Sequence, residues 1–155
     1  MKAIRDSALR ATYRVGYRVL HAYWRLAQPQ KRGVKCVLTR GDEVLLVRHT
    51  YGPETRWELP GGGVKRSEEP RAAAHREARE ELGVDIDDWR FLGDLFDRID
   101  GKRDQLYCYR AELGDRRIET DAAEIAEARW FAHDDLPADV HRYVGRILAL
   151  ESTRG

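Results

Sequence analysis

A single helical segment limits the folds open to this chain more than any other feature. Over residues 70–82, Ala74, Ala78 and Leu82 recur at steps of four, and this spacing predicts a helix with three small or apolar side chains on one face. We expect that face to pack on a β-sheet. Gly83 follows directly and is predicted to end the helix in the left-handed conformation that glycine favours.

Strand-like runs surround this helix and are predicted to form the sheet. They are rich in β-branched and aromatic residues, several are joined by short turns, and they cover residues 33–39, 43–49, 89–97, 103–112 and 128–131. Further helices are predicted at 3–27 and 138–150, with a helical turn at 121–126. Ser67 is the predicted N-cap of the central helix. Hairpin-linked strands interspersed with helices predict an α/β fold, in which helices cover both faces of a mixed sheet.

The length and charge of the chain indicate one folded domain with a basic arm. A chain of 155 residues, 42% of them hydrophobic, is long enough to close one core. Residues 1–32 carry eight basic side chains and one acidic side chain, so a net charge of +1 leaves −6 for residues 33–155. We therefore predict a basic amphipathic helix with its linker over 1–32, and a globular domain over 33–155.

Several features are typical of a cytosolic protein. No run of about 18 apolar residues occurs, so no membrane span is predicted. The N-terminus lacks the apolar core of a secretory signal. The two cysteines, Cys36 and Cys108, lie in strand-like runs and are predicted to be buried, reduced thiols. Cytoplasmic localisation is therefore expected.

The basic N-terminal helix has two interpretations. Its apolar stripe comprises Leu9, Tyr13, Leu20 and Trp24, and its arginines are Arg10, Arg14, Arg18 and Arg25. The stripe could pack on the domain or on a second subunit, which would give a homodimer. Alternatively, the helix could make a peripheral contact with an anionic membrane surface through its arginines and aromatic side chains.

Three carboxylates of the central helix suggest a metal site. Glu77 and Glu81 are four residues apart, and Glu80 is three residues after Glu77, so the three side chains lie on one side of the helix. Like charges at this spacing weaken a helix, whereas Mg²⁺ prefers carboxylate oxygens as ligands. The alternative is a solvated acidic face, because Arg76 and Arg79 are interleaved with the glutamates.

Three consecutive glycines, Gly61 to Gly63, precede this helix and let the backbone approach a metal ion or phosphate closely. With the glutamates they form a pattern, from Gly62 to Val84, that resembles the complete signature of the Nudix hydrolase family. Its seven fixed positions are filled by Gly62, Glu68, Arg76, Glu77, Glu80, Glu81 and Gly83. A looser resemblance extends from Gly33 to Leu150. It implies a Nudix-type α/β/α sandwich around a mixed sheet, to which the N-terminal helix is an addition.

The resemblance also implies roles for individual residues. The implied ligands of a Mg²⁺ ion, or alternatively of Mn²⁺, are Gly61 through its backbone carbonyl, Glu77, Glu80 and Glu81. Glu77 and Glu81 resemble the principal ligands of this set. Glu68 and Arg76 resemble an ion pair that orients the catalytic loop and Glu77.

The implied reaction is hydrolysis of a diphosphate bond in a nucleoside diphosphate joined to another group, or in a nucleoside triphosphate. Metal ions neutralise the phosphate oxygens and activate water, and a carboxylate must accept the proton of that water. Glu77 is one candidate for this base. Glu124, six residues before Trp130, is the favoured candidate for a fourth metal ligand or the base. Its alternative is a solvated loop residue.

Arg48 and Trp57 flank the predicted cleft and are the candidate substrate-binding residues. Trp57 could stack on a nucleobase, or it could be a packing residue at the end of a strand. The five histidines show no ligand spacing. The alternative function is a non-catalytic module that senses nucleotides or lipids, but the chain keeps every carboxylate of the signature. Nucleic-acid binding is not expected, because the domain carries −6 and a phosphate backbone needs a basic surface.

Overall fold

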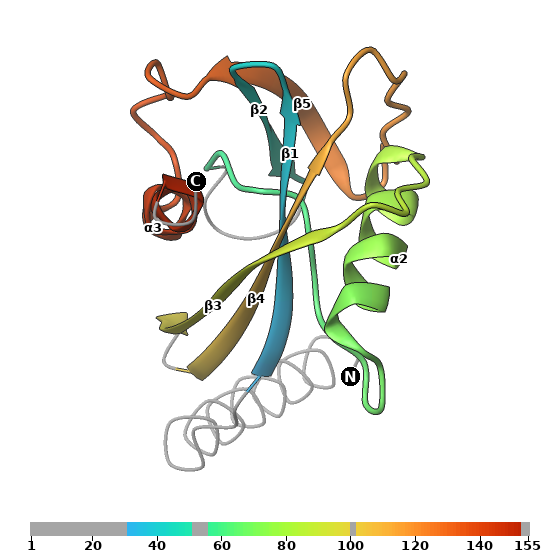
Figure 1. Ribbon diagram of the computed structural model, residues 1–155, viewed down its shortest axis with the longest axis vertical. Helices are drawn as coiled ribbons and strands as arrows, with labels where there is room; N and C mark the ends of the chain where they lie inside the picture. Colours follow the sequence, from blue (N-terminus) through green and yellow to red (C-terminus); the bar gives the residue numbers. More distant parts are fainter. Residues whose placement is uncertain (1–30, 51–55, 100–101, 153–155) are drawn as a thin grey trace, which may run out of the picture. The chain divides into compact units, whose positions relative to one another are not determined.

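The computed structural model of the protein describes residues 31–50, 56–99 and 102–152 (Figure 1). The predicted helix at 3–27 lies outside these residues, so its two interpretations stay predictions. None of the helices in the described part of the chain combines the length and the apolarity that a membrane span needs.

The chain divides into two compact units. One consists of residues 32–95 and 105–155, and the other of residues 1–31 and 96–104. The core and the site described below belong to the first unit.

Five strands form one mixed sheet in the order β3-β4-β1-β2-β5. Strand β2 is antiparallel to both β1 and β5, whereas β1 and β4 run in the same direction in Figure 1. The mixed sheet predicted from the hairpin-linked strands is therefore confirmed. The strands are β1 (Lys31–Arg40), β2 (Glu43–His49), β3 (Arg90–Ile99), β4 (Lys102–Glu112) and β5 (Ile125–Ala132).

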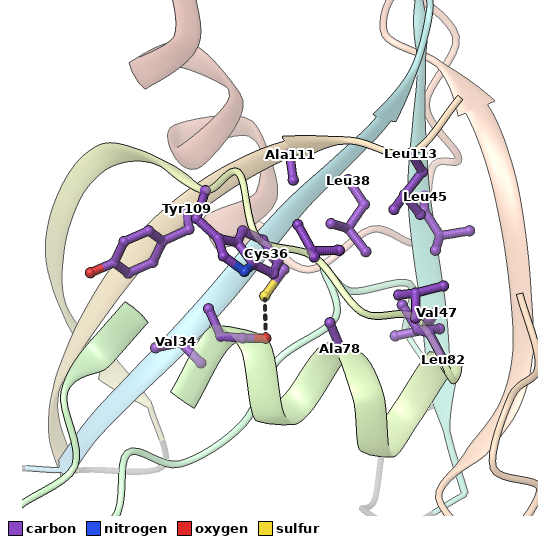
Figure 2. Close-up of a cluster of buried hydrophobic side chains, with 14 of the residues drawn as sticks. Val34, Cys36, Leu38, Leu45, Val47, Ala78, Leu82, Tyr109, Ala111 and Leu113 are labelled. Carbon is purple, nitrogen blue, oxygen red and sulfur yellow. Dashed lines mark hydrogen bonds between the residues drawn. The ribbon is translucent and has the colours of Figure 1, made fainter. Parts of the chain in front are cut away.

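Two helices, α2 (Pro70–Leu82) and α3 (Arg142–Ser152), lie on opposite sides of the sheet (Figure 1). The face of α2 predicted from its spacing is buried against β1, β2 and β4 (Figure 2). Helix α3 buries three of its own side chains, Tyr143, Val144 and Ile147. The α/β/α arrangement is thus confirmed. The core residues contributed by α2 are Ala73, Ala74, Ala78 and Leu82.

The C-terminal end of α2 is as the sequence predicts, whereas its N-terminal end differs from the prediction. Gly83 is left-handed (φ 65°), as predicted, and its N–H bonds back to the carbonyls of the last turn. The N-cap is Glu69 rather than Ser67, and it makes no side-chain capping bond. Ser67 has φ 65° instead, because Glu68 draws this turn toward Arg76 through a pair of hydrogen bonds.

Two later predictions are corrected in their bounds. A helical turn is present, as predicted, because the N–H groups of Glu124 and Ile125 donate to the carbonyl of Asp121 at 3.1 and 2.8 Å. It ends at Ile125 rather than at Ala126, because the strand β5 begins there and pairs with β2. Helix α3 begins at Arg142 rather than near Ala138. The backbone before it bonds to Trp57 instead, whose N–H donates to Asp139 and whose carbonyl accepts from His141, so that Val140 forms a parallel bridge with Trp57.

Candidate functional site

The glycine segment is fixed along β1 by backbone hydrogen bonds. The N–H of Cys36 donates to the carbonyl of Pro60 (2.8 Å), and the N–H of Val34 donates to the carbonyl of Gly62 (2.9 Å). Gly61 lies between these two bonded residues. In the described part of the chain no donor reaches its carbonyl, which leaves this oxygen available to a ligand.

At two of the three glycine positions a side chain would collide with a neighbouring residue, and the neighbour differs between the two. A Cβ on Gly61, which has φ 140°, would lie 2.1 Å from the carbonyl oxygen of Val34. A Cβ on Gly62 would lie 2.5 Å from Oε1 of Glu77, whereas a Cβ on Gly63 would meet nothing within 4 Å. Gly61 therefore allows the segment to lie against β1, and Gly62 provides the space that the carboxylate of Glu77 occupies.

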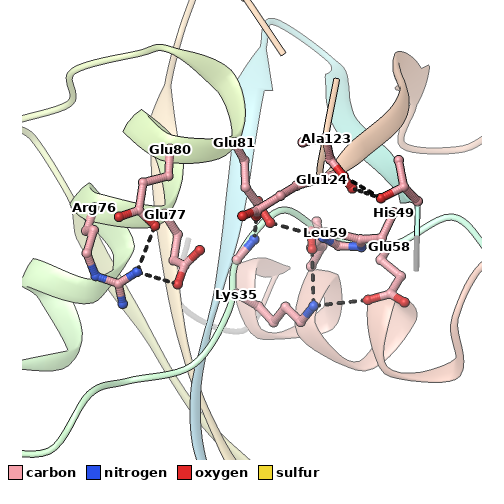
Figure 3. Close-up of polar contacts among 12 residues, drawn as sticks. Lys35, His49, Glu58, Leu59, Arg76, Glu77, Glu80, Glu81, Ala123 and Glu124 are labelled. Atoms are coloured by element: carbon pink, nitrogen blue, oxygen red, sulfur yellow. Dashed lines mark hydrogen bonds and ion pairs between the residues drawn. The ribbon is translucent and has the colours of Figure 1, made fainter. Parts of the chain in front are cut away.

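The carboxylate of Glu81 is buried and is held from two sides (Figure 3). The N–H of Gly61 donates to its Oε2 at 2.9 Å, and Nε2 of His49 lies 3.0 Å from its Oε1. His49 showed no ligand spacing in the sequence, so its place in the site was missed. Its position two residues after the buried Val47 on one strand was the available signal.

Arg76 binds the other two carboxylates of the helix. Its Nη1 lies 2.7 Å from Oε1 of Glu77 and 3.1 Å from Oε2 of Glu80. Glu77 is buried, whereas the side chain of Glu80 is half exposed. Burial raises the pKa of Glu77 above its ordinary value, although Arg76 acts in the opposite direction. Glu77 is therefore a buried carboxylate whose negative charge Arg76 compensates only in part.

The ion pair between Arg76 and Glu68 is present and is bidentate. Nε and Nη2 of Arg76 donate to the two oxygens of Glu68 at 2.9 and 3.0 Å, and Nη2 also donates to the carbonyl of Gly63 at 2.9 Å. These hydrogen bonds, with a further one from the N–H of Lys65, lower the pKa of Glu68 to about 2. Arg76 thus connects the glycine segment, the turn before α2 and Glu77.

The three helix carboxylates do not form one preassembled cage. Within the described residues, no three His, Cys, Asp or Glu side chains are arranged to hold a metal ion. Arg76 holds Glu77 and Glu80, while His49 and Gly61 hold Glu81. The donor set still fits a hard divalent cation, because it offers carboxylate oxygens and a free backbone carbonyl. Arg76 bonds one oxygen of Glu77 and one oxygen of Glu80, so the second oxygen of each carboxylate remains for a cation.

The loop that precedes β5 is anchored to the end of α2. The N–H of Glu119 donates to the carbonyl of Leu82 (2.9 Å), and the N–H of Asp121 donates to the carbonyl of Glu81 (3.0 Å). Its last residue before β5, Glu124, accepts a backbone hydrogen bond from Thr50, the residue after His49. The carboxylate of Glu124 is exposed and has no partner in the described part of the chain. Glu124 therefore lies on the side of the site formed by His49 and Glu81 (Figure 3).

Trp57 is covered rather than open to a ligand. Its exposed fraction is 3%, the guanidinium of Arg48 lies 4.5 Å from its ring centroid, and Phe131 packs against it edge-on at 4.9 Å. Arg48 is itself paired with Asp139 and with Glu127. A nucleobase cannot stack on Trp57 while this packing holds, so the structure favours the packing interpretation of Trp57.

Comparison with known proteins finds a family domain that covers most of the chain. The model of the NUDIX domain matches residues 29–150. The human diphosphoinositol polyphosphate phosphohydrolase 3-beta is 38% identical over 98 residues, which are 62% of this chain and 58% of that protein. The NAD-capped RNA hydrolase NudC of Pseudomonas syringae is 33% identical over 113 residues, 72% of this chain and 40% of that protein. The chain thus spans between two fifths and three fifths of these relatives.

Solved structures show the same fold. A MutT NUDIX hydrolase from Burkholderia pseudomallei superposes with a TM-score of 0.68 and 28% identity, covering 79% of this chain and 97% of that one. The NUDIX domain of NrtR from Shewanella oneidensis, solved with ADP ribose, superposes with a TM-score of 0.70. Its identity is 20%, over 81% of this chain and 88% of that one, and it supports the fold alone.

Proposed function

The chain belongs to the NUDIX family, and on that premise we propose that it hydrolyses a diphosphate bond with the help of a divalent cation. The proposed substrate is a nucleoside diphosphate joined to another group, or a nucleoside triphosphate, and water is the second reactant. The observation that carries this proposal is the meeting of two buried carboxylates, Glu77 and Glu81, with the glycine segment. Buried carboxylates persist when hydrogen bonds or a cation balance their charge.

The proposed cation is Mg²⁺, with Mn²⁺ as the alternative, and members of this family generally use divalent metals. When bound, it would neutralise phosphate oxygens and lower the pKa of a bound water. The chain's own contribution is to supply the ligand oxygens from the core, since α2 and β1 both contribute buried side chains to it. The ligands that we propose are the carbonyl of Gly61, Glu77, Glu80 and Glu81.

Arg76 and Glu68 are proposed to position this set. Because Glu68 takes two donors of the guanidinium, it fixes the plane of Arg76, and Arg76 then fixes Glu77 and the carbonyl of Gly63. Because the planar guanidinium of Arg76 is hydrogen-bonded on more than one side, it fixes the orientation of its partners as well as compensating their charge. Loss of either partner should therefore disturb Glu77 without removing a ligand.

Glu124 is proposed as the general base or as a fourth ligand. The other candidate, Glu77, is buried and already bonded to Arg76, and it is also a proposed ligand. A base must be free to accept a proton and reach solvent. The carboxylate of Glu124 is exposed and unpartnered among the described residues, and its backbone is tied to Thr50 beside His49.

The relatives support the phosphoanhydride as the bond cut. The two relatives are named for a diphosphoinositol polyphosphate and for NAD-capped RNA, and each of these compounds contains a diphosphate linkage. A nucleotide is the class that we favour, because the domain carries −6 and repels a substrate with many phosphates more strongly. Contact of Arg48 with that substrate stays a prediction.

A substrate panel tests the proposal. The wild-type protein should release phosphate or a nucleoside monophosphate from at least one of ADP-ribose, nucleoside triphosphates, dinucleoside polyphosphates and sugar nucleotides in the presence of Mg²⁺. Chelation with EDTA should abolish the release, and Glu124→Gln should lower it without changing the circular dichroism spectrum. Absence of turnover across the panel, with Mg²⁺ and with Mn²⁺, would show that the protein is not this hydrolase.

A further inference from the structure

Lys35 is a buried lysine in the middle of the apolar strand β1. Its neighbours Val34, Cys36 and Val37 have no exposed surface, and Lys35 itself is 9% exposed. A lysine in such a place loses its hydration and persists only when other groups compensate its charge. Its position opposite the α2 face of β1, next to α3, puts it outside the set of residues that the proposed reaction uses.

The ammonium group of Lys35 is bound by the segment that leads into the glycines (Figure 3). Its Nζ donates to Oε2 of Glu58 at 3.1 Å and to the carbonyl of Leu59 at 3.3 Å. The hydroxyl of Tyr143, from α3, donates to the same Oε2 at 2.6 Å, and Nζ lies 4.9 Å from the centroid of the Tyr143 ring. One lysine therefore joins a carboxylate, a carbonyl and the face of an aromatic ring.

The backbone of Lys35 meets the same segment from the other side. The residues before and after it on β1 donate to the carbonyls of Gly62 and Pro60. A Cβ on Gly61 would lie 3.1 Å from Cα of Lys35, so the glycine lies directly on this part of the strand. The segment from Glu58 to Gly62 is thus bound to Lys35 and its neighbours through both side chain and backbone, and its next contact is the bond from Gly61 to Glu81.

We propose that Lys35 is a positioning residue, which sets the place of Gly61 relative to Glu81 and connects helix α3, through Glu58 and Tyr143, to the catalytic centre. The inference rests on the proposed function, since Gly61 and Glu81 are the metal ligands proposed above. The length of the lysine side chain spans from β1 to Glu58, and its charge holds the carboxylate there. Without the ammonium group, the carbonyl of Leu59 loses a hydrogen-bond donor and Glu58 loses its ion pair. The backbone that leads to Gly61 is then no longer held by the side chain of Lys35.

The electrostatics agree with this geometry. Burial alone would lower the pKa of Lys35, but its interactions with Tyr143 and Glu58 outweigh burial and raise the pKa above its ordinary value. Glu58 is likewise buried in part, and Lys35 together with Tyr143 lowers its pKa. Each partner therefore favours the ionised form of the other, as expected of an ion pair.

The test compares Lys35→Met with a matched control in the full-length protein. Methionine keeps an unbranched apolar side chain as far as Cε and removes the ammonium group. The control, Arg110→Met, removes an ion pair at 2.8 Å between β4 and Glu151 of α3, so it loosens α3 without touching the glycine segment. We expect Lys35→Met to weaken Mn²⁺ binding, followed by electron paramagnetic resonance, by about 10–100-fold, as for other residues that support metal ligands. Arg110→Met should leave it unchanged.

Hydrogen exchange of the Gly61 amide gives a second readout that needs neither metal nor substrate. It should accelerate at least about tenfold more in Lys35→Met than in Arg110→Met, because local opening is governed by contacts of that segment. Tyr143→Phe keeps the ring and loses one hydrogen bond, so its Gly61 amide should exchange at a rate between those of the wild type and Lys35→Met. If Lys35→Met does not fold, Tyr143→Phe replaces it as the test variant. Lys35→Arg should restore part of the affinity.

The outcomes separate this inference from the proposed function. If the wild-type protein shows neither turnover nor Mn²⁺ binding, the proposed function fails, and Gly61 exchange still decides whether Lys35 positions the segment. If exchange and Mn²⁺ affinity change equally in Lys35→Met and Arg110→Met, Lys35 has only a structural role and the inference is wrong.

Discussion

Nε2 of His49 lies 3.0 Å from Oε1 of Glu81, and both side chains are buried. The second oxygen of the same carboxylate accepts the N–H of Gly61 at 2.9 Å. The last strand residue of β2 and the glycine segment therefore meet at one side chain of α2. A substitution of Glu81 should therefore affect both His49 and Gly61.

Glu81→Gln should abolish turnover and leave the fold intact. The amide keeps the volume and can still bond to Gly61 and His49, but it removes the charge that a cation needs. Substitution of a residue that only supports a metal ligand typically lowers metal affinity or activity by about 10–100-fold. Substitution of a proposed ligand should therefore lower kcat by more than about 100-fold. Steady-state kinetics on the best substrate of the panel measures this.

Glu119→Gln is the matched control, because Glu119 is exposed and pairs with Arg117 on the surface. It should have wild-type kinetics. Turnover by Glu81→Gln within tenfold of wild type would remove Glu81 from the ligand set.

Gly62→Ala should lower activity with little loss of stability. The added methyl group would lie 2.5 Å from Oε1 of Glu77, and the end of that side chain can move away, but only out of its present place. Gly63→Ala is the control, because its Cβ meets nothing within 4 Å. We expect a loss of kcat of about 10-fold or more for Gly62→Ala, as for other displaced metal-site groups. Equal kinetics of the two variants would contradict the role given to Glu77.

Gly61→Ala should destabilise the protein itself. A Cβ would lie 2.1 Å from the carbonyl oxygen of Val34, and the φ of 140° is strained for any side chain. Backbone strain and overpacking each cost about 1–3 kcal/mol, so urea unfolding should show a loss of about 2–6 kcal/mol. An unfolding midpoint equal to that of Gly63→Ala would show that the segment is not pressed against β1.

The Glu68–Arg76 pair should give a defined pH dependence of stability. The pKa of Glu68 is lowered from its ordinary value of 4.5 to about 2. A lowered pKa adds stability that is complete above the unfolded value and is lost as the pH falls through the folded value. The difference in unfolding free energy between wild type and Glu68→Gln should be constant above about pH 5 and shrink between about pH 4.5 and 2.

Urea titrations at successive pH values measure that difference, with Glu119→Gln as an exposed control that should show no comparable trend. A difference between wild type and Glu68→Gln that stays constant down to pH 2.5 would mean that the ion pair does not form in solution.

The two thiols should be unreactive in the folded protein. Cys36 and Cys108 are both free and buried, and burial raises the pKa of Cys108 to about 12 and that of Cys36 also above its ordinary value. The thiolate is the reactive form, so a disulfide reagent at pH 8 should label the native protein at least about 100-fold more slowly than the protein in denaturant. Fast labelling of one thiol in buffer would indicate local opening of β1 or β4.

The elements predicted most closely are those whose pattern is local. The spacing of Ala74, Ala78 and Leu82 predicted which face of α2 is buried, because periodicity reports directly which side of a helix meets the core. Gly83 ends the helix for an equally local reason. The N-cap at Ser67 was wrong because Glu68, eight residues before Arg76, sets that turn.

The contacts that complete the site could not be predicted, because they join distant residues. His49 meets Glu81 across 32 positions, and Tyr143 meets Glu58 across 85. A lysine inside an apolar strand, such as Lys35, indicates that a partner for its charge exists, and a lone histidine can do the same. Neither residue indicates which side chain that partner is. The family signature supplied the carboxylates, and the fold supplied their partners.

The backbone bonds that hold the loop before β5 have a practical consequence for labelling. Leu113 donates to Thr39 on one side (2.8 Å), and Glu119 donates to Leu82 on the other (2.9 Å), while the residues between them are largely at the surface. The entropy of closing a loop rises slowly with its length, and exposed loop tips accept added sequence. A peptide tag or fluorophore inserted at 115–117 would therefore be attached near the end of α2, where it could report on substrate arrival without entering the core.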